Sequence, residues 1–197
     1  MAGFAVGAVE RKRLLPSPDI AIGDVLLGIS SSGLHSNGFA LVRKIMSLSG
    51  YGYASRCPWK GEVTLGHVLL EPTRIYVSQV LPVAQAGLIK SMAHITGGGF
   101  IDNIPRALPP NLGCYIDAST WTLPPVFKFL MKSGGVEPLE MARTFNNGIG
   151  LVLVVAPDQV EVALAALRKN QAEVYRIGEV VAEARVEMRN LHTWSIP

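Results

Sequence analysis

The chain has 197 residues, of which 49% are hydrophobic and 17% charged, and its formal net charge is +3 at pH 7. Because the basic residues are scattered apart from the run Arg11–Arg13, this charge excludes a broad nucleic-acid-binding surface. The longest apolar run, residues 149–156, is too short to span a bilayer, and no secretory signal follows Met1. We therefore expect a cytoplasmic protein that binds neither nucleic acid nor membranes.

The first half of the chain contains a strand, a polar loop and a helix in succession. Residues 4–10 alternate like a strand, and residues 25–30 form an apolar run typical of a buried strand. The second run leads into a glycine-bearing polar loop, residues 31–38, and then into a helix for which Ser36 or Asn37 is the expected N-cap. His35 in this loop is either a site residue or a histidine that backbone groups satisfy.

The remaining elements follow without repeats. Helices are expected before Pro72, over residues 75–86 with a perturbation at Pro82, after Pro124, over residues 138–143 and over residues 159–169, with Asp158 as the cap of the last. Strands are expected over residues 91–95, 112–117, 149–156, 174–182 and 186–189. The order of elements is mixed, so it predicts an α+β fold: a mixed, largely antiparallel sheet with helices packed over it, in one domain spanning residues 1–197.

A glycine triplet follows the strand predicted at residues 91–95. Thr96 and three glycines, Gly97, Gly98 and Gly99, stand between this strand and the start of a helix. Glycines allow close approach of a ligand to backbone N–H groups, and a helix start leaves such groups unpaired, so the pattern favours anion binding. Arg106, just after Pro105, is expected near the loop, where its guanidinium can bind a phosphate or carboxylate. The alternative is a tight turn with a solvated arginine.

Five sequence blocks then resemble a known family. These are residues 28–37 (GISSSGLHSN), 71–76 (EPTRIY), 94–106 (HITGGGFIDNIPR), 141–150 (MARTFNNGIG) and 176–181 (RIGEVV). They resemble aminoimidazole ribonucleotide synthetase, also called phosphoribosylformylglycinamidine cyclo-ligase, across nearly the whole chain. Leu34 and Phe39 look more like the animal form, which lies inside a trifunctional purine-synthesis protein. Asn147 departs from the family, where an apolar or thiol residue is expected.

The resemblance implies a C-terminal domain of a larger enzyme. In the family, an N-terminal domain supplies most of the contacts to ATP and Mg²⁺ and the core of a homodimer. Residues 2–10 resemble the junction after that domain, and Met1 looks like an introduced start, so the N-terminal domain is expected to be absent from this chain. The implied partners are therefore that domain, a second copy and a small ribonucleotide substrate.

The implied reaction is ring closure in purine biosynthesis. ATP phosphorylates the formamide oxygen of formylglycinamidine ribonucleotide, the amidine nitrogen attacks the activated carbon, and phosphate leaves as the imidazole ring closes. The residues expected to bind substrate are Ser36, Asn37, Gly97, Gly98, Gly99, Asn103 and Arg106, and the catalytic candidates are His35 and His94. His94 would move a proton, or it is a structural histidine within its strand.

Several alternatives remain open for these residues and for the function. Asn103 can simply cap a turn, Arg74 can form a salt bridge, and Asn146 with Asn147 can close the site or form an Asx-turn. Sister enzymes of the same ATP-using superfamily are a second possibility: selenophosphate synthetase, thiamine-monophosphate kinase, a hydrogenase-maturation protein or the preceding amidotransferase. A third is a phosphate-binding or assembly module without turnover, because the chain contains neither a P-loop nor a dinucleotide-binding glycine motif.

Overall fold

A central strand, β1 (Val25–Ser30), anchors the fold of the computed structural model, which describes residues 3–194. All six residues of β1 are buried, and the strand pairs antiparallel with β6 (Ile149–Val155) on one side and β7 (Val174–Val181) on the other. The full sheet has the order β4-β6-β1-β7-β5-β8, with β4 (Ser91–His94), β5 (Gly113–Asp117) and β8 (Val186–Arg189) completing it. Only the pair β5 and β8 is parallel among these neighbours. The predicted α+β fold with a mixed, largely antiparallel sheet is therefore confirmed.

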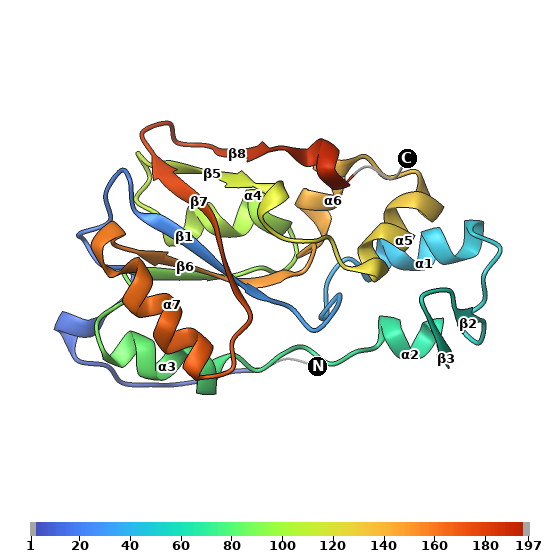
Figure 1. Ribbon diagram of the computed structural model, residues 1–197, viewed down its shortest axis with the longest axis horizontal. Coiled ribbons are helices and arrows are strands. Elements are labelled where there is room, and N and C mark those ends of the chain that lie inside the picture. Colours follow the sequence, from blue (N-terminus) through green and yellow to red (C-terminus); the bar gives the residue numbers. More distant parts are fainter. Residues whose placement is uncertain (1–2, 195–197) are drawn as a thin grey trace.

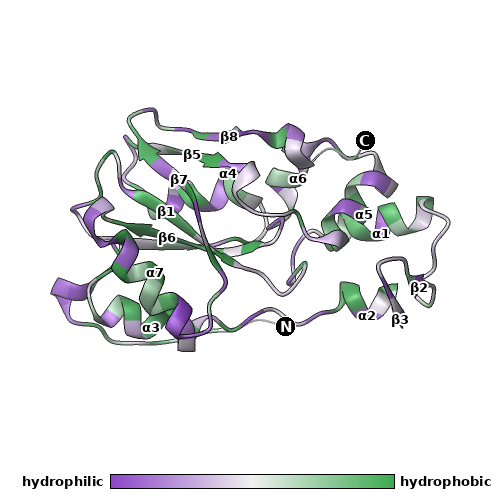
Figure 2. Cartoon of the chain, in the orientation of Figure 1, coloured by the Kyte–Doolittle hydropathy of each residue, from purple (hydrophilic) through white to green (hydrophobic). Residues whose placement is uncertain are grey.

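Two helices cover one face of this sheet. The side chains of Val25, Leu27 and Ile29 alternate along β1 and pack with apolar residues of α3 (Val77–Gln85) and α7 (Val160–Lys169). These two helices lie together on one side of β1 and β6 in Figure 1. A strand that is buried on both faces needs a nearly continuous apolar sequence, and Figure 2 shows β1 and β6 as mostly hydrophobic ribbons.

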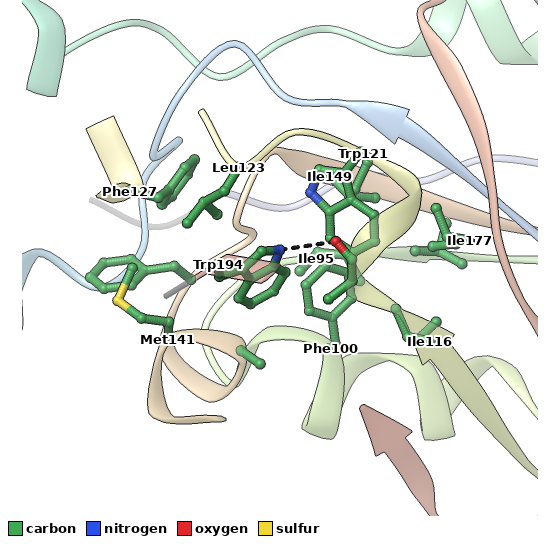
Figure 3. Close-up of a cluster of buried hydrophobic side chains, with 14 of the residues drawn as sticks. Ile95, Phe100, Ile116, Trp121, Leu123, Phe127, Met141, Ile149, Ile177 and Trp194 are labelled. Carbon is green, nitrogen blue, oxygen red and sulfur yellow. Dashed lines mark hydrogen bonds between the residues drawn. The ribbon is translucent and has the colours of Figure 1, made fainter. Parts of the chain in front are cut away.

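The remaining helices share the core on the opposite side of the sheet, and several of them lie beyond the end of β1 in Figure 1. These are α1 (Phe39–Leu48), α2 (Leu65–Leu69), α4 (Gly99–Asn103), α5 (Pro125–Gly134) and α6 (Pro138–Thr144), joined by a small hairpin of β2 (Arg56–Cys57) and β3 (Lys60–Thr64). Figure 3 shows the aromatic part of this core, where Trp194 packs against Trp121 with ring centroids 5.6 Å apart. The indole Nε1–H of Trp194 donates to the Ala118 carbonyl at 3.1 Å, which fixes the chain near its end against the core.

Three local predictions were wrong. Residues 4–10 form no strand: they have no regular secondary structure and are exposed, with Phe4 at 94% exposure, because no neighbouring strand pairs with them in the described part of the chain. Helix α1 begins after Gly38, which has φ +77°, and neither Ser36 nor Asn37 caps it. Asp158 lies in a 3-10 turn ahead of α7, whose N-cap is Gln159.

Two further points concern the first residues of the chain and the possibility of a membrane-spanning helix. The expectation that Met1 is an introduced start, and the Ala2 end of the expected junction, lie outside the described residues. Among residues 3–194, no helix is both long and apolar enough to cross a bilayer.

Candidate functional site

The first polar loop, residues 31–38, begins where β1 ends and is hydrogen-bonded to the segment just before β6. The Ser31 hydroxyl donates to Asn146 Oδ1 at 2.9 Å, and Asn146 Nδ2 donates to the Gly33 carbonyl at 2.9 Å. Asn146 Oδ1 also accepts from the Gly148 N–H, so this residue forms an Asx-turn and clamps the loop at once. A methyl group built on Gly38 would lie 2.3 Å from the Phe145 ring, so only glycine lets the loop approach residues 145–148 this closely.

The structure brings the two predicted catalytic histidines together with a tyrosine. The rings of His35, His94 and Tyr76 form a triangle in which each pair of centroids is 6.2 Å apart. The cluster rests on Gly150 of β6, where a Cβ atom would lie 2.0 Å from Tyr76 Oη and 2.6 Å from His35 Cε1. A glycine at the start of a buried strand thus makes room for the side chains of Tyr76 and His35, which come from distant parts of the sequence.

His35 is buried and held in a fixed orientation. The residue is 4% exposed, and its backbone has φ +59°, a conformation that is uncommon outside glycine. The Nε2 atom accepts from the backbone N–H of Ser32 at 3.3 Å and of Arg74 at 3.4 Å. Burial, together with the nearby His94 and Arg74, lowers the pKa of His35 to about 4. His35 is therefore a neutral imidazole at physiological pH.

His94 differs from His35 in its surroundings. It ends the edge strand β4, and its side chain is more exposed than that of His35. Partial burial also lowers the pKa of His94, so its imidazole is neutral near pH 7 and able to accept a proton. His94 therefore has both the solvent access and the protonation state that proton transfer requires, whereas His35 is enclosed.

A short segment, residues 72–76, lies along the first loop. Ser32 Oγ donates to the Pro72 carbonyl at 2.6 Å, Arg74 Nη1 donates to Ser30 Oγ at 2.8 Å, and Tyr76 Oη donates to the Ser30 carbonyl at 3.1 Å. Together with the hydrogen bond between Arg74 N–H and His35, these contacts hold the segment against the loop. We call residues 72–76 the Arg74 segment.

Arg74 is half-buried, and no carboxylate in the described part of the chain pairs with it. The charge of its guanidinium adds to the effect of burial in lowering the pKa of His35, and it opposes the rise that burial causes in the pKa of Tyr76. Between the first loop and the Arg74 segment lies a hollow of about 280 Å³, lined on one side by His35 and Ser36 and on the other by residues 70–73. The hydroxyls of Ser36 and Thr73 meet at its edge, 3.3 Å apart.

The glycine loop is shaped from inside by one asparagine. Asn103, which is buried, donates through Nδ2 to the carbonyls of Gly97 at 3.1 Å and Gly99 at 2.8 Å, and its Oδ1 accepts from the Thr96 hydroxyl at 3.0 Å. Gly98 and Gly99 have φ values of +94° and +55°. A Cβ atom on Gly99 would lie 2.0 Å from the Ala142 carbonyl oxygen of α6, so close packing as well as conformation requires glycine there. Asn103 thus holds the shape of the loop; its expected contact with substrate stays a prediction.

The two loops meet, as the predicted common site requires. A methyl group built on Gly97 would lie 3.6 Å from Asn37 Oδ1, which places the side chain of Asn37 beside the exposed edge of the glycine loop. Ile95 N–H donates to the Gly150 carbonyl at 2.9 Å, so the same glycine of β6 supports both the histidine cluster and the start of the glycine loop. The substrate-binding role of Asn37, Gly97 and Gly98 stays a prediction.

Arg106 lies farther along the same segment. It is exposed in the turn Ile104–Ala107, seven residues after the first residue of α4, which corresponds to about 10 Å along a helix. Its expected contact with an anion at the glycine loop would require most of the length of its side chain. Among residues 3–194 there is also no group of three or more His, Cys, Asp or Glu side chains placed to hold a metal ion.

The whole region can now be compared with known proteins. A family model described as AIR synthase related protein, C-terminal domain, matches residues 21–189. The chain belongs to this family. The match covers β1 to β8, and it includes both polar loops, the histidine cluster and the Arg74 segment.

Solved structures share the fold of this AIR synthase-related domain. The chain is similar to Thermotoga maritima PurL complexed with AMPPCP, with 16% identity, a TM-score of 0.54, and coverage of 92% of this chain and 26% of that one. It is similar to thiamine-monophosphate kinase from Stenotrophomonas maltophilia K279a (15% identity, TM-score 0.60, coverage 86% and 51%) and to Escherichia coli HypE (19%, 0.55, 89% and 49%). The chain thus spans between a quarter and about half of the length of these proteins.

Two site residues carried little signal in the sequence. Tyr76 belongs to the matched block of residues 71–76, and for Arg74 in the same block a salt bridge was the alternative to a place in the site. Both are brought to the site by hydrogen bonds to Ser30, more than forty residues earlier in the chain. A pairing over that sequence distance has no local pattern from which it can be predicted.

Proposed function

We propose that this chain is the C-terminal half of an aminoimidazole ribonucleotide synthetase, which cyclises formylglycinamidine ribonucleotide with ATP in purine biosynthesis. The observation that carries the proposal is the joining of the two polar loops around two neutral imidazoles and a guanidinium without a carboxylate partner in the described chain. Ring closure needs a site for the ribose phosphate and a group that accepts a proton as the amidine nitrogen attacks. Both requirements are met within this one cluster.

The chain's own residues divide these tasks as follows. Arg74 and the backbone of the glycine loop bind anionic oxygens, because a guanidinium and free N–H groups are strong donors to phosphate. Asn37 and Ser36 orient the substrate from the first loop, and His94 accepts the proton, since its imidazole is neutral and open to solvent.

The nucleotide and its metal are assigned to the rest of the enzyme. In keeping with the family resemblance, we assign most of the contacts to ATP and Mg²⁺ to an N-terminal synthetase domain. The same domain would supply the core of a homodimer, and the complete enzyme would be cytoplasmic, as one part of a trifunctional purine-synthesis protein. ATP would supply the phosphoryl group that activates the formamide oxygen.

The sister activities are the second candidate class. Solved PurL structures are described as complexes with AMPPCP, ADP and FGAR, and another similar structure is a thiamine-monophosphate kinase. At these identities the likeness extends to the fold alone. The blocks GLHSNGF, HITGGG and NIPR together favour the cyclo-ligase over these relatives.

The test is to co-express the chain with the N-terminal half of an aminoimidazole ribonucleotide synthetase and to measure ATP-dependent ring closure. The pair should form aminoimidazole ribonucleotide, whereas the chain alone should bind substrate weakly and turn over none. Thiamine monophosphate and selenide serve as competing acceptors. Turnover of either of these, with no ring closure, would assign the chain to a sister enzyme. Substrate binding without turnover of any acceptor by the pair would leave a binding module.

A further inference from the structure

The position of hydrogen on His35 follows from its neighbours. Two backbone N–H groups, those of Ser32 and Arg74, point at Nε2 from 3.3 and 3.4 Å. A backbone N–H can only donate, so Nε2 must keep its lone pair, and the neutral ring must carry its hydrogen on Nδ1. A proton on Nε2 would face two donors and break both contacts.

The environment of the Nδ1 atom, which carries the hydrogen, differs from that of Nε2. It is buried and has no hydrogen-bond partner within the described chain, and the residue holds a positive φ of +59°. An unpaired buried donor and an uncommon backbone conformation both lower the stability of the folded chain. Such destabilising features are found mostly at functional sites. The lowered pKa of the ring agrees with a histidine that stays neutral and does not cycle through its charged form.

What His35 holds in place is the Arg74 segment. The contact from Arg74 N–H to Nε2 joins residue 74 to residue 35, and Arg74 Nη1 then reaches Ser30 Oγ at 2.8 Å. The guanidinium keeps further donors that no carboxylate of residues 3–194 occupies, and it lies near the rings of His35 and Tyr76. A half-buried cation with free donors is a binding group for an anion.

We propose that His35 is a positioning residue and not a proton-transfer group: its Nε2 fixes the backbone of Arg74, and the Arg74 guanidinium binds a phosphate group of the ligand. That this phosphate belongs to the substrate's ribose rests on the proposed function; the hydrogen position and the anion contact do not. Proton transfer is left to His94.

The tautomer is tested directly by NMR. In a ¹⁵N-labelled chain, two-bond proton–nitrogen correlations distinguish a protonated from an unprotonated ring nitrogen. We expect His35 to show a protonated Nδ1 and an unprotonated Nε2 from pH 8 down to pH 5. A protonated Nε2 in this range would overturn the assignment.

Two variants separate the acceptor from the ring. In His35→Gln the side-chain carbonyl can reach the position of Nε2, whereas in His35→Asn the carbonyl lies near the position of Nδ1. Asn tolerates a positive φ better than Gln, so backbone strain favours Asn while the acceptor position favours Gln. If His35 acts through Nε2, Gln preserves the Arg74 segment and Asn does not.

The readout is binding of ribose 5-phosphate, followed on the Nε–H signal of Arg74. The unmodified chain and His35→Gln should bind within about threefold of each other, and His35→Asn should bind about tenfold more weakly, because two backbone hydrogen bonds lose their acceptor. Arg74→Gln should abolish the binding. Equal weakening in Gln and Asn, or no binding of the probe to the unmodified chain at tens of millimolar, would overturn the proposal.

The outcome is separable from that of the proposed function, because neither NMR nor probe binding requires turnover. In the complete enzyme, a positioning role predicts that His35→Asn raises KM for the ribonucleotide more than it lowers kcat, with partial recovery in His35→Gln. An equal loss of kcat in both variants with KM unchanged would make His35 the proton-transfer group instead.

Discussion

Replacing Gly150 with alanine should displace rings of the cluster that His35, His94 and Tyr76 form beside β6. The added Cβ would lie 2.0 Å from Tyr76 Oη, 2.6 Å from His35 Cε1 and 3.1 Å from Tyr76 Cζ, all far inside normal contact distance. Because β6 is fixed by neighbours on both sides, the rings must move and not the strand. Tyr76 would then lose its hydrogen bond to the Ser30 carbonyl.

The cost combines two effects. Forcing an extra methyl group into a packed interior costs about 1–3 kcal/mol, and the lost buried hydrogen bond adds about 1 kcal/mol. Their sum, about 2–4 kcal/mol, corresponds to a fall in the thermal midpoint of roughly 5–15 °C for a chain of this length. Differential scanning calorimetry of Gly150→Ala against the unmodified chain measures this fall directly.

Two further variants isolate the cause. Gly61→Ala is the matched control, because a Cβ atom at Gly61 meets nothing within 4 Å, and its midpoint should change by less than about 2 °C. Combining Gly150→Ala with Tyr76→Phe removes the atom nearest the new methyl group and should recover part of the loss. A Gly150→Ala midpoint equal to that of Gly61→Ala would refute the close packing of the cluster on β6.

Three other predictions follow from the structure. Gly98→Val should weaken binding of ribose 5-phosphate at least several-fold, because Gly98 has φ +94° and a Cβ atom would lie 2.5 Å from Asp102; unchanged binding by the folded variant would show that the loop is only a turn. Lys90→Met should lower the free energy of unfolding in urea by about 3 kcal/mol or more, because it leaves the buried Asp24 carboxylate without its partner at 2.8 Å; a loss below 1 kcal/mol would contradict this. The free energy of unfolding should fall by up to about 3 kcal/mol as pH drops from 6.5 to 4, because unfolded His35 takes up a proton that the folded residue, with its pKa of about 4, does not; His35→Gln should show a smaller fall, and equal slopes would refute the shifted pKa.

Much of the fold could be predicted because its elements have strong local patterns. The apolar run of β1 indicated a buried strand, and Pro125 and Gly135 bracket α5 as the usual preferences at helix ends require. Sheet order could not be predicted, since the pairing of β1 with β6 joins residues more than a hundred positions apart. The prediction of the α1 N-cap was wrong because it also depends on a contact between distant residues. The Phe145 ring occupies the space beside Gly38, and no local pattern shows this.

The candidate site divides in the same way. The loops were identified because glycine, serine and histidine gather within a few residues, and the structure brings Asn37 next to Gly97. Clustering of this kind did not point to Arg74, the cation that lies beside these loops. Arg106 was favoured because it is near the glycine loop in sequence, whereas Arg74 is held beside His35 by hydrogen bonds that only the folded chain forms.

This difference changes which group we expect to contribute most to the proposed anion binding. The helix after the glycine loop has only five residues, and the N–H of Gly99 already donates to the Thr96 carbonyl at 3.0 Å, so the loop offers fewer free donors than its sequence suggested. A hydrogen bond to a charged group contributes about 1.5–3 kcal/mol, against about 1 kcal/mol for a neutral pair. A guanidinium held in place before the ligand arrives also loses less conformational freedom on binding. In the proposed site we therefore expect the glycine loop to shape the edge and to admit the ligand to the backbone, while Arg74, held through His35, supplies the charge.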